Sequence, residues 1–215
     1  MFDLIIFDCD GVLVDSEYLT NTVFVEMLNE LGIPLTLEDM FERFVGNSMS
    51  HCFELIQQLL GKPVPEGFIT EYTNRTTIEL KKNLKPVDGI VEVLSVLEMP
   101  YCVASSGDHK KMQTTLGITN LLSHFEGKLF SVTEVARGKP YPDVFLYAAE
   151  RMGVKPAKCA VVEDTPIGAR AGIAAGMKVF GYAKLTPVHK LEKEGAIPFD
   201  DMRQLPYLLK QQGIN

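Results

Sequence analysis

The sequence lacks the features that mark nucleic-acid-binding, secreted and membrane proteins. Its 21 lysines and arginines are outnumbered by 28 aspartates and glutamates, which gives a formal net charge of −7 and a pI near 5.2. Binding to nucleic acid or to an anionic membrane needs a basic patch, so we expect neither partner. A basic leader with an apolar core is missing, and so is an apolar run of 18 residues. Neither secretion nor membrane insertion is therefore indicated.

Cysteine is scarce, and its spacing forms no pair. The four cysteines (Cys9, Cys52, Cys102 and Cys159) include no C-x-x-C motif, and three of them lie in apolar, strand-like runs. Such a distribution is typical of reduced, mostly buried thiols, and it favours a cytoplasmic protein.

The chain is long and apolar enough to bury a full core. With 215 residues, 46% of them hydrophobic and 23% charged, it fits one domain of ordinary size or a domain with an insert. The composition is neither that of a disordered chain nor that of a fibrous one.

The most informative stretch is the first predicted strand and the residues after it. Four large apolar residues at 4–7 run directly into Asp8 and Asp10, and Gly11 follows. A continuous apolar run of this kind is typical of a buried strand of a parallel sheet, whose carboxyl end is where ligands bind. Two acids at such a position repel each other unless a divalent metal or a proton intervenes. A simple Asp-Gly turn is the alternative for this segment alone.

The order of the predicted elements gives the fold class. Apolar spacing and capping residues predict helices at 17–31, 36–44, from Ser48 or Ser50 to 61, and from Pro65 to about 84, with no convincing strand among them. From residue 85 the pattern alternates, with strands at 101–105, 129–131, 159–162 and 178–182, and helices near 91–97, 111–116, 144–152, 166–175 and 202–212. Alternation of this kind predicts an α/β fold with a Rossmann-like, doubly wound parallel sheet.

The helical block divides the chain into two predicted domains. Residues 1–15 and 85–215 form the sheet domain, and residues 16–84 form a helical insert. We expect the insert to be a cap over the strand-end site, joined to the sheet domain by two linkers that can hinge.

Three further segments bring polar side chains to the same edge of the sheet. Ser105 and Ser106 end one strand, Glu163 and Asp164 end another, and Lys139 lies in a loop flanked by prolines. Each has an ordinary alternative: a helix N-cap, acids that answer a helix dipole, and a solvated surface lysine. Asp8, Asp10, Glu163 and Asp164, with Ser105 and Lys139, place four carboxylates, a hydroxyl and a cation at one edge. Hard oxygen ligands without a His or Cys cluster suit Mg2+, and the combination suits phosphoryl transfer.

With these residues in place, the sequence resembles the haloacid dehalogenase (HAD) superfamily. Within it, the chain is similar to the β-phosphoglucomutase and 6-phosphogluconate phosphatase group, which has a helical cap after the first strand. The four motifs that carry the resemblance are FDCDGVLVDSE at 7–17, VASSG at 103–107, GKPYPD at 138–143 and VEDT at 162–165. They occur in order and at fitting spacing along essentially the whole chain.

The resemblance implies a role for each motif residue. Asp8 would attack phosphorus and become an aspartyl-phosphate, while Asp10 would protonate the leaving alcohol and then activate water. Ser105, with Ser106, would bind the phosphoryl group, and Lys139 would hold that group and Asp8 together. The metal would be Mg2+, held by Asp8, Asp164, the backbone carbonyl of Asp10 and, as ligand or outer partner, Glu163. The implied activity is that of a phosphatase acting on a small phosphorylated metabolite, a sugar phosphate or a sugar-acid phosphate.

Two other activities stay open at this stage. A phosphosugar mutase of this group carries a cap histidine and a cap arginine, whose places here hold Thr20 and Met49. A phosphate-binding protein without catalysis would have no need of Asp10.

The cap residues expected to face substrate are Glu17, Arg43, Asn47, Ser48 and His51, with solvated helix residues as the alternative for each. The sequence does not indicate an oligomeric state, and a monomer is compatible with it.

Overall fold

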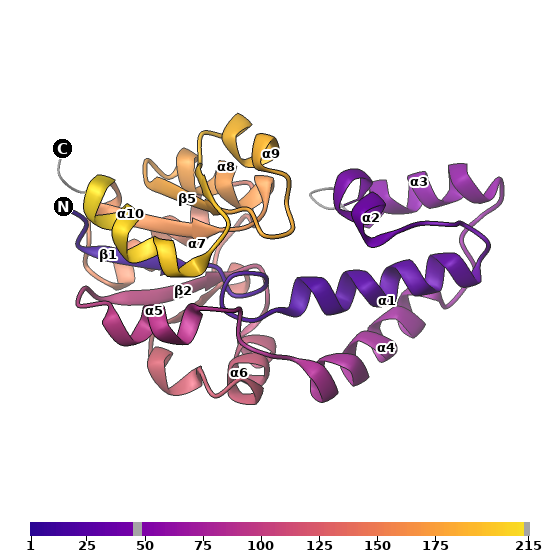
Figure 1. The fold of residues 1–215 in the computed structure, drawn as a ribbon, viewed down its shortest axis with the longest axis horizontal. Coiled ribbons are helices and arrows are strands. Elements are labelled where there is room, and N and C mark those ends of the chain that lie inside the picture. The colour runs from indigo at the N-terminus through magenta and orange to yellow at the C-terminus, as the bar shows by residue number, and fades with distance from the viewer. Residues whose placement is uncertain (45–48, 213–215) are drawn as a thin grey trace. The chain divides into compact units, whose positions relative to one another are not determined.

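The computed structural model describes residues 1–44 and 49–212 (Figure 1). The chain divides into two compact units: Met1–Asp15 with Lys85–Asn215, called here the sheet unit, and Ser16–Leu84, called the helical unit. Each unit is described by itself.

The sheet unit is built on one parallel sheet. Within the described residues its strands are β1 (Leu4–Phe7), β2 (Tyr101–Ser105), β3 (Leu129–Ser131), β4 (Cys159–Glu163), β5 (Lys178–Tyr182) and β6 (Ile197–Phe199). They lie in the order β3-β2-β1-β4-β5-β6, and every neighbouring pair is parallel. The predicted α/β class with a Rossmann-like sheet is confirmed. β1 and β4 lie in the middle, so the acids that follow them are held at the centre of the carboxyl edge.

Helices cover both faces of this sheet. They are α5 (Ile90–Val96), α6 (His109–Ile118), α7 (Asp143–Arg151), α8 (Pro166–Ala174), α9 (Val188–Lys193) and α10 (Leu205–Gln212), with short 3-10 turns η1 (Leu122–Phe125), η2 (Val132–Glu134), η3 (Pro156–Lys158) and η4 (Met202–Gln204). Figure 1 shows α5 and α6 on one side of the sheet and α8 and α9 on the other. Because side chains alternate along a strand, Leu4 and Ile6 of β1 belong to the core that α7 and α8 complete.

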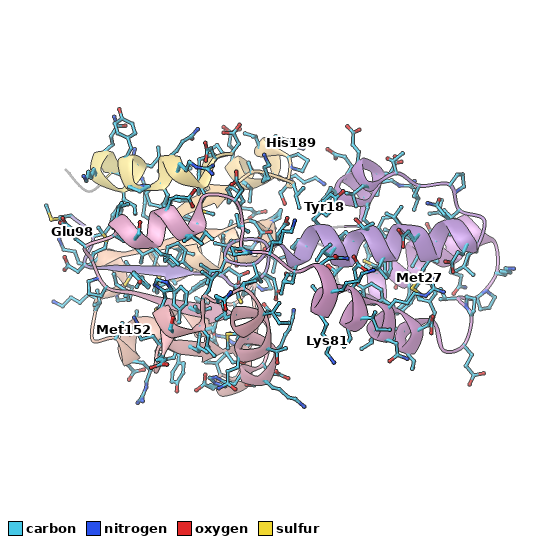
Figure 2. All side chains as sticks on the ribbon, turned by 60° about the horizontal axis from the view of Figure 1, so that its bottom comes forward. Tyr18, Met27, Lys81, Glu98, Met152 and His189 are labelled. Atoms are coloured by element: carbon cyan, nitrogen blue, oxygen red, sulfur yellow. The ribbon has the colours of Figure 1, made fainter. Side chains whose placement is uncertain are left out.

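The helical unit consists of α1 (Ser16–Glu30), α2 (Leu37–Arg43), α3 (Met49–Leu60) and α4 (Phe68–Asn83). Phe24 of α1 is central to its core and makes edge contacts with the rings of Phe44, Phe68 and Tyr72 at centroid distances of 6.3, 5.7 and 5.1 Å. Figure 2 labels two more α1 residues, the buried Met27 and the exposed Tyr18.

The predicted start of the fourth helix at Pro65 is wrong. α4 begins at Phe68, because Gly67 precedes it with a φ of 82°, a left-handed conformation that no helix residue adopts. The third helix is described from Met49, so Ser48 as its predicted opening residue lies outside the described residues.

The sheet unit ties together the two chain segments that lead to and from the helical unit. Asp15 donates its backbone N–H to the carbonyl of Lys85 (2.9 Å), and Val87 donates to Leu13 (3.0 Å). Val14 also forms an isolated antiparallel bridge with Pro86. The exit and return of the chain are therefore fixed against each other beside the Asp8–Asp10 loop.

The four cysteines are free and buried, as predicted. Among the helices described here, none combines the length and the apolar character that crossing a membrane requires. A cytoplasmic location stays a prediction.

Candidate active site

Parallel pairing brings the functional residues of β1 and β4 to one place. Phe7 is in register with Val162, and the N–H of Asp8 donates to the carbonyl of Val162 at 2.9 Å. Asp8 therefore leaves β1 beside the point where Glu163 and Asp164 leave β4. One carboxylate oxygen from each of these three buried acids lies within 4.8 Å of the other two.

Lys139 reaches into this group of acids from the loop before α7. Its Nζ donates to Asp8 Oδ1 at 2.6 Å, to Glu163 Oε1 at 2.6 Å and to the carbonyl of Ala104 at 3.1 Å. The Lys139 side chain is only 4% exposed, so the alternative of a solvated surface lysine is excluded. The ammonium also lies 4.8 Å from the ring centroid of Phe145, a favourable cation–π distance.

The loop that carries Lys139 is closed by a pair of side chains at its ends. Arg137 makes a bidentate ion pair with Asp143, with Nε–Oδ1 at 3.0 Å and Nη2–Oδ2 at 2.9 Å. The same guanidinium lies 4.4 Å from the ring centroid of Tyr141. Because Asp143 begins α7, this pair fixes the loop between Arg137 and the helix, and Lys139 in the loop points inward.

Burial dominates the electrostatics of Asp8, and the charge of Lys139 is the largest effect that opposes it. Burial raises the pKa of Asp8 to about 7, aided by the neighbouring Glu163 and Asp10 carboxylates and opposed by Lys139. Burial alone would lower the pKa of Lys139, but the charges of Asp8 and Glu163 hold it above the ordinary value. Lys139 is therefore charged at neutral pH. The Asp8 carboxyl needs further positive charge beside it to ionise fully at that pH.

Both oxygens of Glu163 are engaged by the protein. Oε1 accepts from Lys139, and Oε2 accepts from the backbone N–H groups of Asp164 and Thr165 (both 3.1 Å) and from the Thr165 hydroxyl (3.0 Å). The carboxylate lies directly against Gly168 of α8: a Cβ there would be 1.8 Å from Oε1. Thr165 caps α8 by accepting from the N–H of Gly168 at 3.1 Å.

The residues present fit a hard divalent cation. Three buried carboxylates with one lysine carry a net charge of −2, which one divalent ion neutralises, and all the side-chain donors are carboxylate oxygens. Since Glu163 already accepts four hydrogen bonds, Asp8 and Asp164 are the better side-chain ligands. The side chain of Asp10 is not one of the three clustered acids.

Asp10 is instead paired with a residue that the sequence did not single out. Lys111 of α6 donates from Nζ to Asp10 Oδ2 at 2.6 Å. Lys111 lies four residues beyond the VASSG motif and shares no motif with any acid. The helical spacing of 111–116 was visible in the sequence, but the length of one side chain and the turn before α6 decide this contact.

The end of β2 and the loop after it present Ser105 and Ser106 at the same edge. Ser105 is buried, and its Oγ accepts from the N–H of Gly107 at 3.0 Å. Ser131, at the end of β3, donates to the carbonyl of Gly107 at 2.8 Å and braces the loop from the next strand. Ser106 is exposed, and α6 begins after Asp108, which caps it.

The described candidates in the helical unit contact neighbours close in sequence. Glu17 accepts from Asn21, with Oε2 and Nδ2 3.0 Å apart. The guanidinium of Arg43 lies 5.9 Å from the ring centroid of Phe44, and His51 pairs with Glu54 at 3.2 Å. Asn47 and Ser48 lie outside the described residues. The buried Asn21 was not predicted from the sequence, and its side chain also bonds the backbone of Glu17.

Comparison with known proteins agrees with this geometry. Residues 2–176 match the haloacid dehalogenase-like hydrolase family. The 6-phosphogluconate phosphatase of Escherichia coli is 33% identical over 213 residues, which cover 98% of this chain and 96% of that protein. The β-phosphoglucomutase of Bacillus subtilis is 32% identical over 202 residues, covering 86% of this chain and 84% of that protein.

A solved structure shows the same architecture. A conserved haloacid dehalogenase-like protein of unknown function from Agrobacterium tumefaciens superposes with a TM-score of 0.95 and 33% identity, and the match covers 99% of this chain and 100% of that one. The resemblance predicted from the four motifs is confirmed, and so is the enzyme class predicted with it, a HAD-like phosphatase. This chain belongs to the haloacid dehalogenase-like hydrolase family.

Proposed function

We propose that this protein is a Mg2+-dependent phosphomonoester hydrolase that acts on a small phosphorylated metabolite, a sugar phosphate or a sugar-acid phosphate. The observation that carries the proposal is the buried Lys139, which bridges Asp8 and Glu163 at 2.6 Å each, with Asp164 in the same cluster. Burying a lysine together with three acids costs stability, so such a cluster is typical of a site whose chemistry needs both charges. The 6-phosphogluconate phosphatase relative supports the substrate class.

Asp8 is the nucleophile in this proposal. Its Oδ1 is held by Lys139, so its other oxygen can attack the phosphorus of the ester and form an aspartyl-phosphate. Lys139 offsets the charge of the transferred group while it holds Asp8 in position. A divalent cation held by Asp8 and Asp164, and by the backbone carbonyl of Asp10, would offset the remaining negative charge of the phosphoryl group. Glu163 orients Lys139 from behind.

Asp10 is the proton carrier. It gives a proton to the leaving alcohol oxygen, and it then takes a proton from the water that hydrolyses the aspartyl-phosphate. The Ser105 hydroxyl and the polar groups of Ser106 hold the phosphoryl oxygens. Release of inorganic phosphate returns Asp8 to its starting state.

We propose that the helical unit is the cap of this enzyme and supplies the contacts that select the substrate. Glu17, Arg43, Asn47, Ser48 and His51 are its candidate contacts. Because they lie on an insert that is compact by itself, they can vary without disturbing the sheet unit that carries the chemistry.

A phosphosugar mutase is the second candidate, because the match to the β-phosphoglucomutase relative, at 32% identity, covers 86% of this chain and 84% of that protein. The Thr20 hydroxyl donates to the carbonyl of Glu17 at 3.3 Å, so it is used within its own helix. Thr20 has no basic group to move a proton on a sugar hydroxyl, which favours the hydrolase.

The test is a panel of phosphorylated sugars, sugar acids and small alcohols incubated with the protein and Mg2+, with inorganic phosphate as the readout. We expect release of phosphate from a subset of the panel and none in EDTA. Conversion of one sugar phosphate into an isomer without phosphate release would establish the mutase instead.

A further inference from the structure

The Asp10–Lys111 pair lies beside the buried cluster of acids and differs from it in exposure. The side chain of Lys139 is 4% exposed, whereas that of Lys111 is 47% exposed. Lys139 pairs with the acids that would handle the phosphoryl group. Lys111 pairs with the acid that would hand a proton to the alcohol part of the ester.

The path of the Lys111 side chain is fixed along its length. Its backbone N–H donates to Asp108 Oδ1 at 2.7 Å in the capped first turn of α6. Its stem then passes over Gly107, where an added Cβ would meet Lys111 Cδ at 3.1 Å. The ammonium ends 2.6 Å from Asp10 Oδ2. The side chain therefore runs across the Ser105–Gly107 loop to the proton carrier.

This position puts a positive charge next to the leaving group. In the proposed reaction the Asp10 carboxyl touches the ester oxygen, so the Lys111 ammonium lies one carboxyl group away from the alcohol part of the substrate. A negative charge on that alcohol, a few bonds from the ester oxygen, would be attracted to Lys111, and a neutral alcohol would not. At a half-exposed site the attraction is moderate rather than large.

We propose that Lys111 determines specificity, by favouring phosphomonoesters of hydroxy acids, with a carboxylate close to the ester oxygen, over phosphomonoesters of neutral alcohols. The inference rests on the proposed function and narrows its substrate class. Lys111 acts on the alcohol part and takes no part in the transfer of the phosphoryl group.

The test uses two esters that differ at one group and share the configuration of the neighbouring carbon. D-3-Phosphoglycerate carries a carboxylate where sn-glycerol 1-phosphate carries a hydroxymethyl group. The ratio of kcat/KM for the two is measured with Mg2+ for the wild type, Lys111→Met, Lys111→Arg and the control Lys110→Met. Lys110 is the exposed neighbour and makes the same change in net charge.

We expect the wild type to prefer the anionic ester and Lys111→Met to lower the ratio about tenfold, as the loss of one charge-assisted contact would. Lys111→Arg should keep most of the preference, and Lys110→Met should leave it unchanged. Equal losses for both esters in Lys111→Met would mean that Lys111 only positions Asp10, and this would overturn the inference. A wild type without preference for the anionic ester would also overturn it.

The same assay distinguishes an error in the proposed function from an error in the inference about Lys111. If the wild type releases no phosphate from any ester, 4-nitrophenyl phosphate included, the proposed function is wrong and the inference falls with it. If 4-nitrophenyl phosphate is hydrolysed and the charge preference is absent, only the inference is wrong.

Discussion

Replacing Gly168 by alanine tests the placement of Glu163 most sharply. An alanine Cβ at this position would lie 1.8 Å from Oε1, 1.9 Å from Cδ and 2.2 Å from Oε2 of Glu163. Atoms do not approach so closely, and the obstacle is a carboxylate that is itself held at both oxygens. Either α8 moves away from the sheet or Glu163 leaves its position.

The size of the effect follows from what must break. Displacement of Glu163 removes its 2.6 Å contact with Lys139 and its contacts with the backbone of Asp164 and with Thr165. Overpacking a core costs about 1–3 kcal/mol, and breaking a buried charge pair costs about 3–5 kcal/mol. We expect Gly168→Ala to lower the free energy of unfolding by about 3 kcal/mol or more, which is a fall in Tm of about 6–12 °C for a chain of this size.

The assay is urea unfolding followed by far-UV circular dichroism, because the chain has no tryptophan to report by fluorescence. Gly117→Ala is the matched control: it is also a helical glycine, and a Cβ there meets nothing within 4 Å. That variant should be as stable as the wild type or more stable, by up to about 1 kcal/mol.

A double variant separates the clash from other effects of the alanine. Glu163→Ala removes the carboxylate that the Cβ of Gly168→Ala would contact. The double variant should therefore lose much less free energy of unfolding than the sum of the losses in the two single variants. Gly168→Ala with the stability of the wild type would refute the placement of Glu163 against α8.

Three further predictions concern the metal, pH and the substrate. Mg2+ at one hundred times its Kd should raise the free energy of unfolding of the wild type by about 2.7 kcal/mol, measured as a rise in Tm. Asp164→Asn should lose most of this gain, and an equal gain in that variant would remove Asp164 from the ligand set. In EDTA, the pKa of Asp8 is about 7 in the folded protein against 3.8 ordinarily, so the folded state holds the proton longer. The stability that Asp8 confers is complete below pH 3.8 and is lost as the pH rises through about 7; in urea unfolding Asp8→Asn should lack this loss, and the same slope in both proteins would contradict it. Lys111→Met should lower the preference for D-3-phosphoglycerate over sn-glycerol 1-phosphate about tenfold, as measured by the ratio of kcat/KM.

The sequence predicts the centre of the sheet well because burial leaves a local signal there. β1 and β4 are continuous apolar runs that end in acids, and the parallel pairing of Phe7 with Val162 brings those acids together. β6 and α9 carry no such signal. β6 has three residues with Pro198 in the middle, which an edge strand tolerates and a strand pattern does not show.

The residues of the candidate site likewise include some that the sequence predicts and some that it does not. Asp8, Glu163 and Asp164 lie at the ends of β1 and β4, so the fold class is enough to bring them together. Lys139 lies in the loop before α7, and only its motif placed it with them. Lys111 and Gly168 could not be predicted, because they act through the length of a side chain and the lack of one, on helices whose exact placement the sequence does not give.

Asp8 as the nucleophile of a metal-dependent phosphatase is tested by the rate of phosphate release from 4-nitrophenyl phosphate with Mg2+, compared between the wild type and Asp8→Asn. The variant exchanges one oxygen for an amide nitrogen of equal size, and circular dichroism and Tm establish that it is folded. Phosphate release by the variant should fall to the uncatalysed rate. Retained activity in a folded Asp8→Asn protein would contradict it.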